Sequence, residues 1–125
     1  MTQTILRLAL GAAICAALSG CITFRTVDDG IARARIGETV QSGKVAIRPT
    51  RVLEDSRCPA GVQCVWAGRV RIAAELDGAP AELTLGAPQA TPGGAQVTLV
   101  EVYPAARKDT TYFPEEYRFG FRVTR

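Results

Sequence analysis

The sequence predicts an all-β protein: a small antiparallel β-sandwich or partly open barrel of six to seven strands that follows a signal peptide. Three observations support this fold class. Apolar residues recur at every second position in several segments after residue 35. Turn-forming residues separate these segments, and no stretch of ten or more residues beyond position 21 has a helical period. Because a sandwich and an open barrel give the same alternation, both architectures stay open.

The chain begins with MTQTILRLALGAAICAALSGC, which has the layout of a secretory signal. Arg7 precedes an apolar run from Leu8 to Leu18, and two small residues follow that run. An apolar helix of this length spans roughly 16 Å, about half of the ~30 Å hydrocarbon core of a bilayer. We therefore expect residues 1–20 to be a signal peptide and not a permanent membrane-spanning helix.

The last residues of this segment, Leu18-Ser19-Gly20-Cys21, resemble the lipobox of exported bacterial lipoproteins. The resemblance implies that the Cys21 thiol receives a diacylglyceryl group and that cleavage leaves Cys21 as the acylated N-terminus, with palmitate as a further chain. Two or more acyl chains hold a protein firmly to a membrane, whereas one chain does so only marginally. The alternative is an ordinary cleavage after Ser19 that releases a soluble protein.

Ile22 follows the cysteine in place of an aspartate. This favours the outer membrane of a two-membrane bacterium, with the protein facing the periplasm. On this interpretation residues 21–34 are a lipidated N-terminus and tether, and residues 35–125 form a β-sandwich-like domain.

The first strands of the domain are expected between residues 36 and 53. IGETV, which begins at Ile36, predicts a short strand, and GKVAIRP places Val45 and Ile47 on one face of the next. The alternation then changes phase at Pro49, because Val52 has the opposite parity. A β-bulge, or a strand edge that lacks a hydrogen-bond donor, would explain the change.

The later strands have the clearest patterns. GRVRIAAELD (68–77) and EYRFGFRVT (116–124) both alternate apolar residues with charged ones, which is typical of half-buried strands. AELTL (81–85) and AQVTLVEVYP (95–104) predict two more strands. Asp77-Gly78 predicts a tight hairpin turn after the first of these segments.

Four arginines lie on the charged faces of the two clearest strands: Arg69, Arg71, Arg118 and Arg122. If these strands are neighbours in a sheet, the arginines form a basic stripe for anionic lipid or glycan. The alternative is an ordinary solvated face that is balanced by acidic residues.

The cysteines predict a structural disulfide. Cys15 leaves with the signal peptide and Cys21 takes the lipid, so Cys58 and Cys64 remain in a compartment outside the reducing cytoplasm. Their Cys-x5-Cys spacing differs from the Cys-x-x-Cys of redox sites. A structural zinc site needs four Cys or His ligands, and the chain has no histidine.

The residues around these cysteines have two possible roles. Trp66 is expected to pack beside the disulfide, and Arg57 is expected to pair with Asp55 or Glu54, so that the segment only builds shape. In the other interpretation, Arg57 points outward from a rigid loop and binds a carboxylate or phosphate. The structural role is favoured.

The segment DSRCPAGVQCVWAG resembles the Asp-Ser-Arg-Cys-Pro-x4-Cys-x-Trp-Ala-Gly signature of small bacterial envelope proteins, many of them predicted lipoproteins. The matching residues are Asp55, Ser56, Arg57, Cys58, Pro59, Cys64, Trp66, Ala67 and Gly68. The resemblance implies a location in the cell envelope, and it carries no activity that could be transferred to this chain.

A second candidate surface is AARKDTTYFPEE, residues 105–116, which carries Arg107, Tyr112 and Phe113. Basic and aromatic residues on a loop can form a recognition surface. The favoured alternative is that the aromatic side chains fold back and cap a small core.

These features exclude several classes of function. Without Arg7, the 15 basic residues become 14, which against 12 acidic residues leaves a net charge of +2, so a nucleic-acid partner is not expected. The chain has no histidine, and its two remaining thiols are expected to be bonded to each other, so the common pairs of a nucleophile and a base are absent. We therefore expect neither an enzyme nor a cofactor or metal site.

The leading hypothesis is a lipid-anchored, non-catalytic envelope β domain that contacts another envelope component, such as an envelope protein or peptidoglycan. The alternative is a small-ligand-binding or inhibitor module that uses the Cys58–Cys64 loop and the 105–116 loop. A binding module should expose Arg57 and either Tyr112 or Phe113 on one rim. A scaffold should bury the aromatic side chains and hold Arg57 in a local salt bridge.

Overall fold

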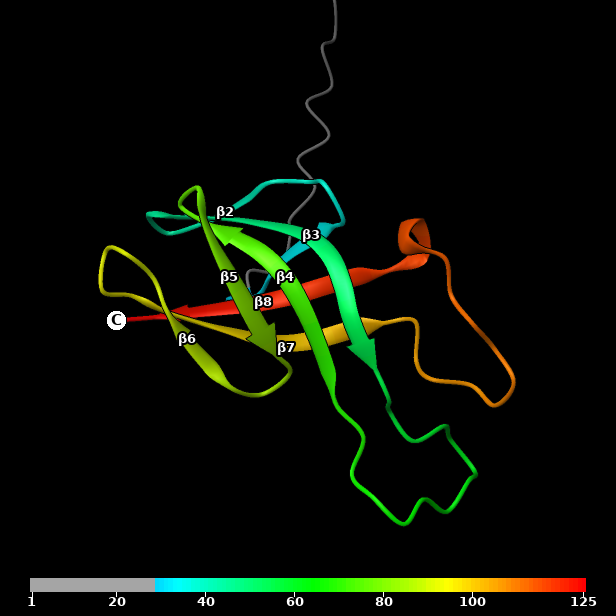
Figure 1. Ribbon diagram of the computed structural model, residues 1–125. Helices are drawn as coiled ribbons and strands as arrows, with labels where there is room; N and C mark the ends of the chain where they lie inside the picture. The colour runs from blue at the N-terminus through cyan, green and yellow to red at the C-terminus, as the bar shows by residue number, and fades with distance from the viewer. Residues whose placement is uncertain (1–28) are drawn as a thin grey trace, which may run out of the picture.

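The computed structural model describes residues 29–125 (Figure 1). The expected signal peptide and the lipidation at Cys21 lie outside the described residues. In this range the chain forms two four-stranded antiparallel sheets that do not close into a barrel, as the all-β prediction required. No helix within residues 29–125 is long and apolar enough to cross a bilayer.

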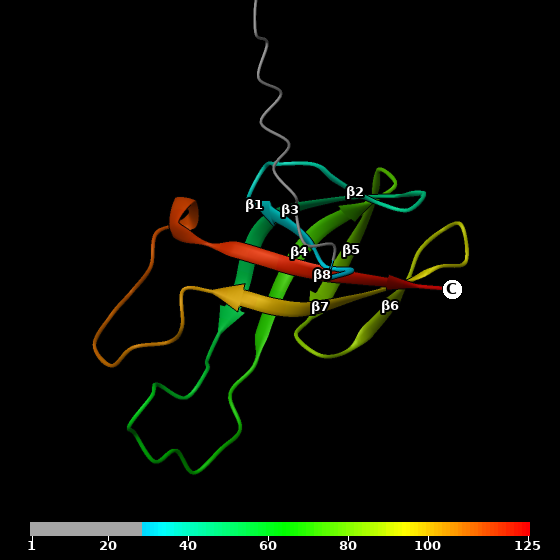
Figure 2. The ribbon, with the colours of Figure 1, turned by 180° about the vertical axis from the view of Figure 1, so that it is seen from behind.

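Between residues 29 and 125 the strands follow one another along the chain, and one short 3₁₀ helix, η1, precedes the last strand. Their bounds are β1 Ala32–Arg35, β2 Val40–Ser42, β3 Val45–Asp55, β4 Val70–Leu76, β5 Ala79–Thr84, β6 Pro88–Ala90, β7 Gln96–Tyr103, η1 Pro114–Glu116 and β8 Arg118–Thr124. One sheet has the order β1-β8-β7-β6 and the other has the order β2-β3-β4-β5. Figures 1 and 2 show the two sheets stacked face to face.

The core lies between the sheets and is built from the apolar positions that the alternation predicted. β4 buries every second residue, from Val70 to Leu76, and β8 buries Phe119 and Phe121. Each of these larger side chains contributes roughly 1.5–3 kcal/mol when it is fully buried. Phe119 and Phe121 are at most 1% exposed, so β8 provides the largest apolar groups of the core.

The change of phase at Pro49 is a β-bulge. In the β3–β4 pair, Pro49 lies opposite Ala74 and Arg51 lies opposite Ala73, so Thr50 is the extra residue. The Thr50 hydroxyl donates to the Ala73 carbonyl over 3.0 Å. A bulge bends its strand, and β3 is visibly curved in Figure 1.

The folded domain begins earlier than expected. Residues 32–34 were assigned to the tether, but β1 starts at Ala32 and pairs with β8 along its whole length. Ala34 is 2% exposed, so burial against the core fixes this short strand in place. The strand expected at Ile36 lies instead at Val40–Ser42, because Gly37 turns the chain with a φ of 82°.

Two long connections leave the same end of the sandwich. One joins β3 to β4 and contains both cysteines; we call residues 56–69 the disulfide loop. The other joins β7 to β8 and includes the 105–116 segment. Figures 1 and 2 show the disulfide loop projecting beyond the ends of both sheets.

Candidate functional site

The two ends of the disulfide loop are joined by hydrogen bonds between Ser56 and Arg69. The Ser56 N–H donates to the Arg69 carbonyl over 2.9 Å, and the Arg69 N–H donates to Ser56 Oγ over 3.0 Å. Gly68 lies against this pairing, and a Cβ at position 68 would collide with the backbone of Ser56 and Arg57. The loop can therefore close so tightly only with glycine at this position.

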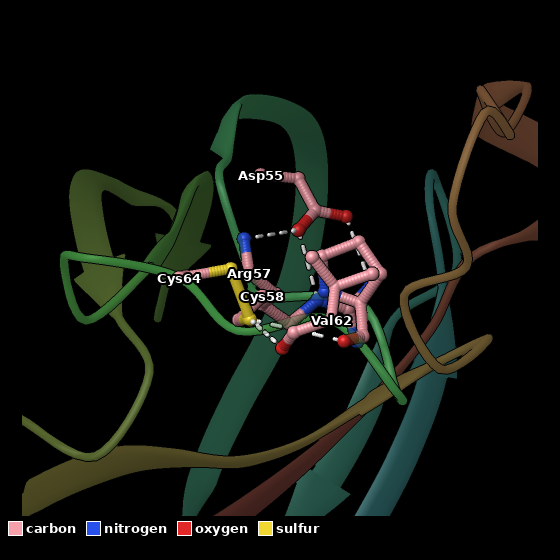
Figure 3. Close-up of a disulfide and its surroundings, with 6 residues drawn as sticks. Asp55, Arg57, Cys58, Val62 and Cys64 are labelled. Atoms are coloured by element: carbon pink, nitrogen blue, oxygen red, sulfur yellow. Dashed lines mark hydrogen bonds and ion pairs between the residues drawn. A yellow bond between two sulfur atoms is a disulfide. The ribbon is translucent and has the colours of Figure 1, made fainter.

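The predicted disulfide is present. Cys58 and Cys64 are bonded, with their Cα atoms 6.0 Å apart (Figure 3). Within the ring, the Val62 N–H donates to the Pro59 carbonyl over 3.2 Å and closes a turn. A closed ring of this size stabilises the fold by roughly 2 kcal/mol on a chain-entropy estimate.

Arg57 points inward and binds Asp55 with both arms of its guanidinium. Arg57 Nε and Nη2 lie 2.8 Å from Asp55 Oδ1 and Oδ2 respectively (Figure 3). Nη1 donates to the Val102 carbonyl over 3.2 Å, and Nη2 donates to the Pro104 carbonyl over 2.9 Å. The Arg57 and Asp55 side chains are only 15% and 16% exposed. Arg57 thus joins the base of the disulfide loop to the end of β7, which is the local ion pair expected of a scaffold.

Tyr117 completes this cluster, although the sequence analysis did not include it. Its hydroxyl donates to Asp55 Oδ2 over 2.9 Å. Burial and the contact with Asp55 raise the pKa of Tyr117 to about 12. The bond from Arg57, opposed by burial and helped by the Tyr117 hydroxyl, lowers the pKa of Asp55. The sequence could have indicated this role, because Tyr117 was placed on the buried face of its strand and a buried tyrosine hydroxyl needs a hydrogen-bond partner.

The aromatic residues of the 105–116 segment divide into two groups. Tyr112 is half-buried, its ring meets the Tyr117 ring edge-on at 6.1 Å, and its hydroxyl donates to the Ala105 carbonyl over 2.7 Å. Tyr112 therefore caps the core. Phe113 is 68% exposed and stays on the surface.

Two apolar side chains of the disulfide loop, Val65 and Trp66, are open to solvent, and we call these two residues the tip of the loop. Val65 is 93% exposed and Trp66 is 65% exposed. The prediction that Trp66 packs beside the disulfide is therefore wrong. Because β4 begins only at Val70, Trp66 lies beyond the end of the sheet, where no core surface covers it.

A shallow depression of about 360 Å³ lies between the disulfide loop and the 105–116 segment. Asp55, Arg57, Arg107 and Tyr112 contribute to its lining, so the structure brings four of the candidate residues together. The other two candidates, Trp66 and Phe113, are not part of its lining.

The basic stripe, which required these two strands to be neighbours and was the less favoured interpretation, does not form, because β4 and β8 belong to different sheets. On the β4 side, Arg69 and Arg71 bind Glu54 at 2.8 and 3.3 Å, and Arg71 also binds Glu82 at 2.6 Å. Within residues 29–125, no group of three or more acidic or thiol side chains is arranged to hold a metal ion.

The fold and these loops define a small antiparallel β-sandwich with a disulfide-closed loop at one end. Comparison with protein-family models, with curated proteins and with solved structures finds no significant match.

Proposed function

We propose that this protein is a lipid-anchored, non-catalytic β domain of the bacterial cell envelope that contacts another envelope component through the tip of its disulfide loop. The observation that carries the proposal is the exposure of Val65 and Trp66, at 93% and 65%, on a loop with a fixed base. Buried tryptophans are among the most common energetic anchors of protein interfaces. A preorganised loop also loses less conformational entropy when it binds.

The rigidity of the loop rests on three separate restraints. The disulfide closes the ring, the pairing of Ser56 with Arg69 joins the two ends, and Arg57 holds the base against β7. A solvent-exposed tryptophan on a mobile loop would be an ordinary surface residue. On a restrained loop it is a preformed contact point.

The proposed location rests on the sequence. The lipobox resemblance at Cys21 supports acylation, and Ile22 supports sorting to the outer membrane, with the domain in the periplasm. The Cys58–Cys64 disulfide agrees with an oxidising compartment, where such bonds persist.

The buried cluster supports a non-catalytic role. Asp55 and Arg57 compensate each other's charge, and the raised pKa of Tyr117 keeps its phenol protonated at neutral pH. None of these three groups therefore offers a free base or nucleophile.

The second candidate function is a small-ligand-binding or inhibitor module. The depression between the disulfide loop and the 105–116 segment favours it, because Arg107 lies on its rim with an exposed side chain. Its volume of about 360 Å³ is at the low end for small-molecule sites.

The test is photocrosslinking in living cells with the full-length chain. A photoreactive residue is placed at Trp66, at Arg107 or, as a control on the exposed face of β2, at Gln41. We expect a discrete product from position 66 that mass spectrometry identifies as an envelope protein or a peptidoglycan fragment. A product from position 107 alone would favour the second candidate, and identical patterns at all three positions would refute both.

The membrane anchor is tested separately by fractionation. Cys21→Ser should move the protein from the membrane fraction to the soluble periplasmic fraction. If the variant still sediments with membranes, the lipid anchor is wrong, whatever the crosslinking shows.

A further inference from the structure

Two arginines face each other on the outer face of the β1-β8-β7-β6 sheet. Arg35 in β1 lies directly opposite Arg118 in β8, and Arg118 lies opposite Tyr103 in β7. We call these three residues the arginine row. Side chains that are directly opposite in an antiparallel pair have Cβ atoms about 4.5–5.5 Å apart, so like charges in such a pair repel each other. All three residues are exposed and line an open cavity of about 600 Å³.

Among residues 29–125, the neighbouring carboxylates do not reach ion-pair distance of these two guanidinium groups. Glu101 binds Arg33, with Oε2 3.0 Å from Nε and Oε1 3.1 Å from Nη2. Glu38 accepts the backbone N–H of Arg35, and Glu116 accepts the backbone N–H of Phe113 over 2.7 Å. Within residues 29–125, no acidic side chain forms an ion pair with the guanidinium of Arg35 or Arg118.

The adjacent row of the sheet explains why Glu101 binds elsewhere. Arg33, Gly120 and Glu101 lie opposite one another across the same three strands. A Cβ on Gly120 would lie 2.8 Å from Glu101 Oε2, so glycine lets the Arg33–Glu101 ion pair cross directly over β8. Among the residues that the structure describes, the sheet thus has a row with a closed ion pair beside a row whose two arginines form no ion pair.

We propose that the arginine row binds the phosphate group of an anionic ligand. Each guanidinium presents two parallel N–H donors, and one carboxylate would satisfy only one such fork. A phosphate monoester offers three non-bridging oxygens and up to two negative charges, and the phosphodiester of a phospholipid offers two such oxygens and one charge. Either can therefore present a separate acceptor oxygen to each of the two guanidinium groups. The Tyr103 hydroxyl, on the third strand of the row, is available as a further donor.

The rim of the cavity limits the size of this ligand. Three carboxylates also line the cavity, those of Glu101, Glu115 and Glu116, and they disfavour a second phosphate beside the first. The site therefore suits a single phosphate group and not a polyanion such as nucleic acid. The source is either a soluble phosphate compound or the headgroup of an anionic phospholipid. The arginine row shares no residue with the tip at Val65 and Trp66, so this proposal does not depend on the proposed partner contact.

The test uses the chain from residue 21 onward with Cys21→Ser, which keeps both sheets whole. Inorganic phosphate is titrated at constant ionic strength, with chloride as the compensating salt, and binding is followed by the backbone amide signals of Tyr103 and Arg118. We expect saturable binding that Arg35→Gln and Arg118→Gln each weaken at least tenfold. Arg118→Lys keeps the charge but loses the guanidinium fork, so it should restore only part of the affinity.

The matched control is Arg122→Gln. Arg122 lies on the same strand and is exposed, but its register partner on β7 is Thr98 and not a second cation. This variant should bind phosphate as the parent does. Circular dichroism melts of all variants check that each keeps the fold.

A second arm identifies the source of the phosphate. Vesicles of phosphatidylglycerol and of phosphatidylcholine are sedimented with the parent and with Arg118→Gln. Binding to phosphatidylglycerol that Arg118→Gln abolishes assigns the site to a lipid headgroup, and saturable binding of phosphate alone assigns it to a soluble compound. If neither probe binds, or if Arg122→Gln loses as much as Arg118→Gln, the proposal is overturned.

Discussion

Truncation of Arg57 should destabilise the fold strongly, although the residue lies at the base of a surface loop. Arg57→Ala removes four hydrogen bonds at once: two to Asp55, one to the Val102 carbonyl and one to the Pro104 carbonyl. It leaves a largely buried carboxylate whose remaining side-chain partner is the Tyr117 hydroxyl.

The structure sets the size of the effect. Removing one partner of a buried ion pair costs about 3–5 kcal/mol, and hydrogen bonds to charged groups contribute about 1.5–3 kcal/mol each. Because the side chains of Arg57 and Asp55 are still 15% and 16% exposed, water will replace part of the lost hydrogen bonding to Asp55. We therefore expect a decrease of about 3 kcal/mol in the free energy of unfolding. For a domain of roughly 100 residues, this lowers Tm by about 15 °C.

The assay is equilibrium urea denaturation followed by far-ultraviolet circular dichroism. Trp66 fluorescence is unsuitable, because this side chain is already 65% exposed in the folded protein. Arg51→Ala is the control, since Arg51 is an exposed residue of β3, the strand that leads into the disulfide loop. It should change stability by less than about 0.5 kcal/mol. If Arg57→Ala costs no more than Arg51→Ala, the ion pair does not hold the loop and the reasoning fails.

The remaining predictions concern the same end of the sandwich. In the folded protein the pKa of Tyr117 is raised to about 12, above its unfolded value of ~10. The stability that the protonated phenol contributes is therefore complete below pH ~10 and is lost as the pH rises to about 12. Denaturation at a series of pH values should show this loss in the parent protein, and Tyr117→Phe should not show it. Gly68→Ala forces a methyl group into the opposite leg of the disulfide loop and should cost about 2 kcal/mol in thermal denaturation, whereas Gly93→Ala, which has room for the methyl group, should cost less than half of that. Cys58→Ser should lower the free energy of unfolding by roughly 2 kcal/mol. Dithiothreitol should shift the urea midpoint of the parent protein but not that of the variant, and equal shifts in both would show that the Cys58–Cys64 bond is not the source of the effect.

The strands that could be predicted are those with one face in the core. The alternation in residues 70–76 and 118–124 is the direct consequence of burial on one side, and even the bulge after Pro49 left a visible change of parity. β6 left no such signal, since Pro88, Gln89 and Ala90 are all exposed. β1 was missed for a related reason: four residues with only one of them buried are too few to establish a period.

The site was harder to predict because its contacts are distant in sequence. The pairing of Asp55 with Arg57 is local, and it was expected from the sequence. The carbonyl groups that Arg57 also binds belong to Val102 and Pro104, and no pattern marks a backbone acceptor. The position of Trp66 was predicted wrongly because an apolar side chain near a disulfide is usually buried with it. Trp66 is exposed because β4 begins only at Val70, and the sequence did not mark that boundary.

The pairing of Ser56 with Arg69 also separates two properties of the protein that usually change together. Both sheets lie on one side of this pairing. On the other side, within the disulfide loop, the contributions to stability described above come from Arg57, the Cys58–Cys64 bond and Gly68. Substitutions at residues 59–63 and 65–67, which leave Cys64 in place, should therefore alter what the tip recognises with little effect on folding. In related chains, or in a laboratory library, this segment is where new binding specificities could arise without a loss of stability.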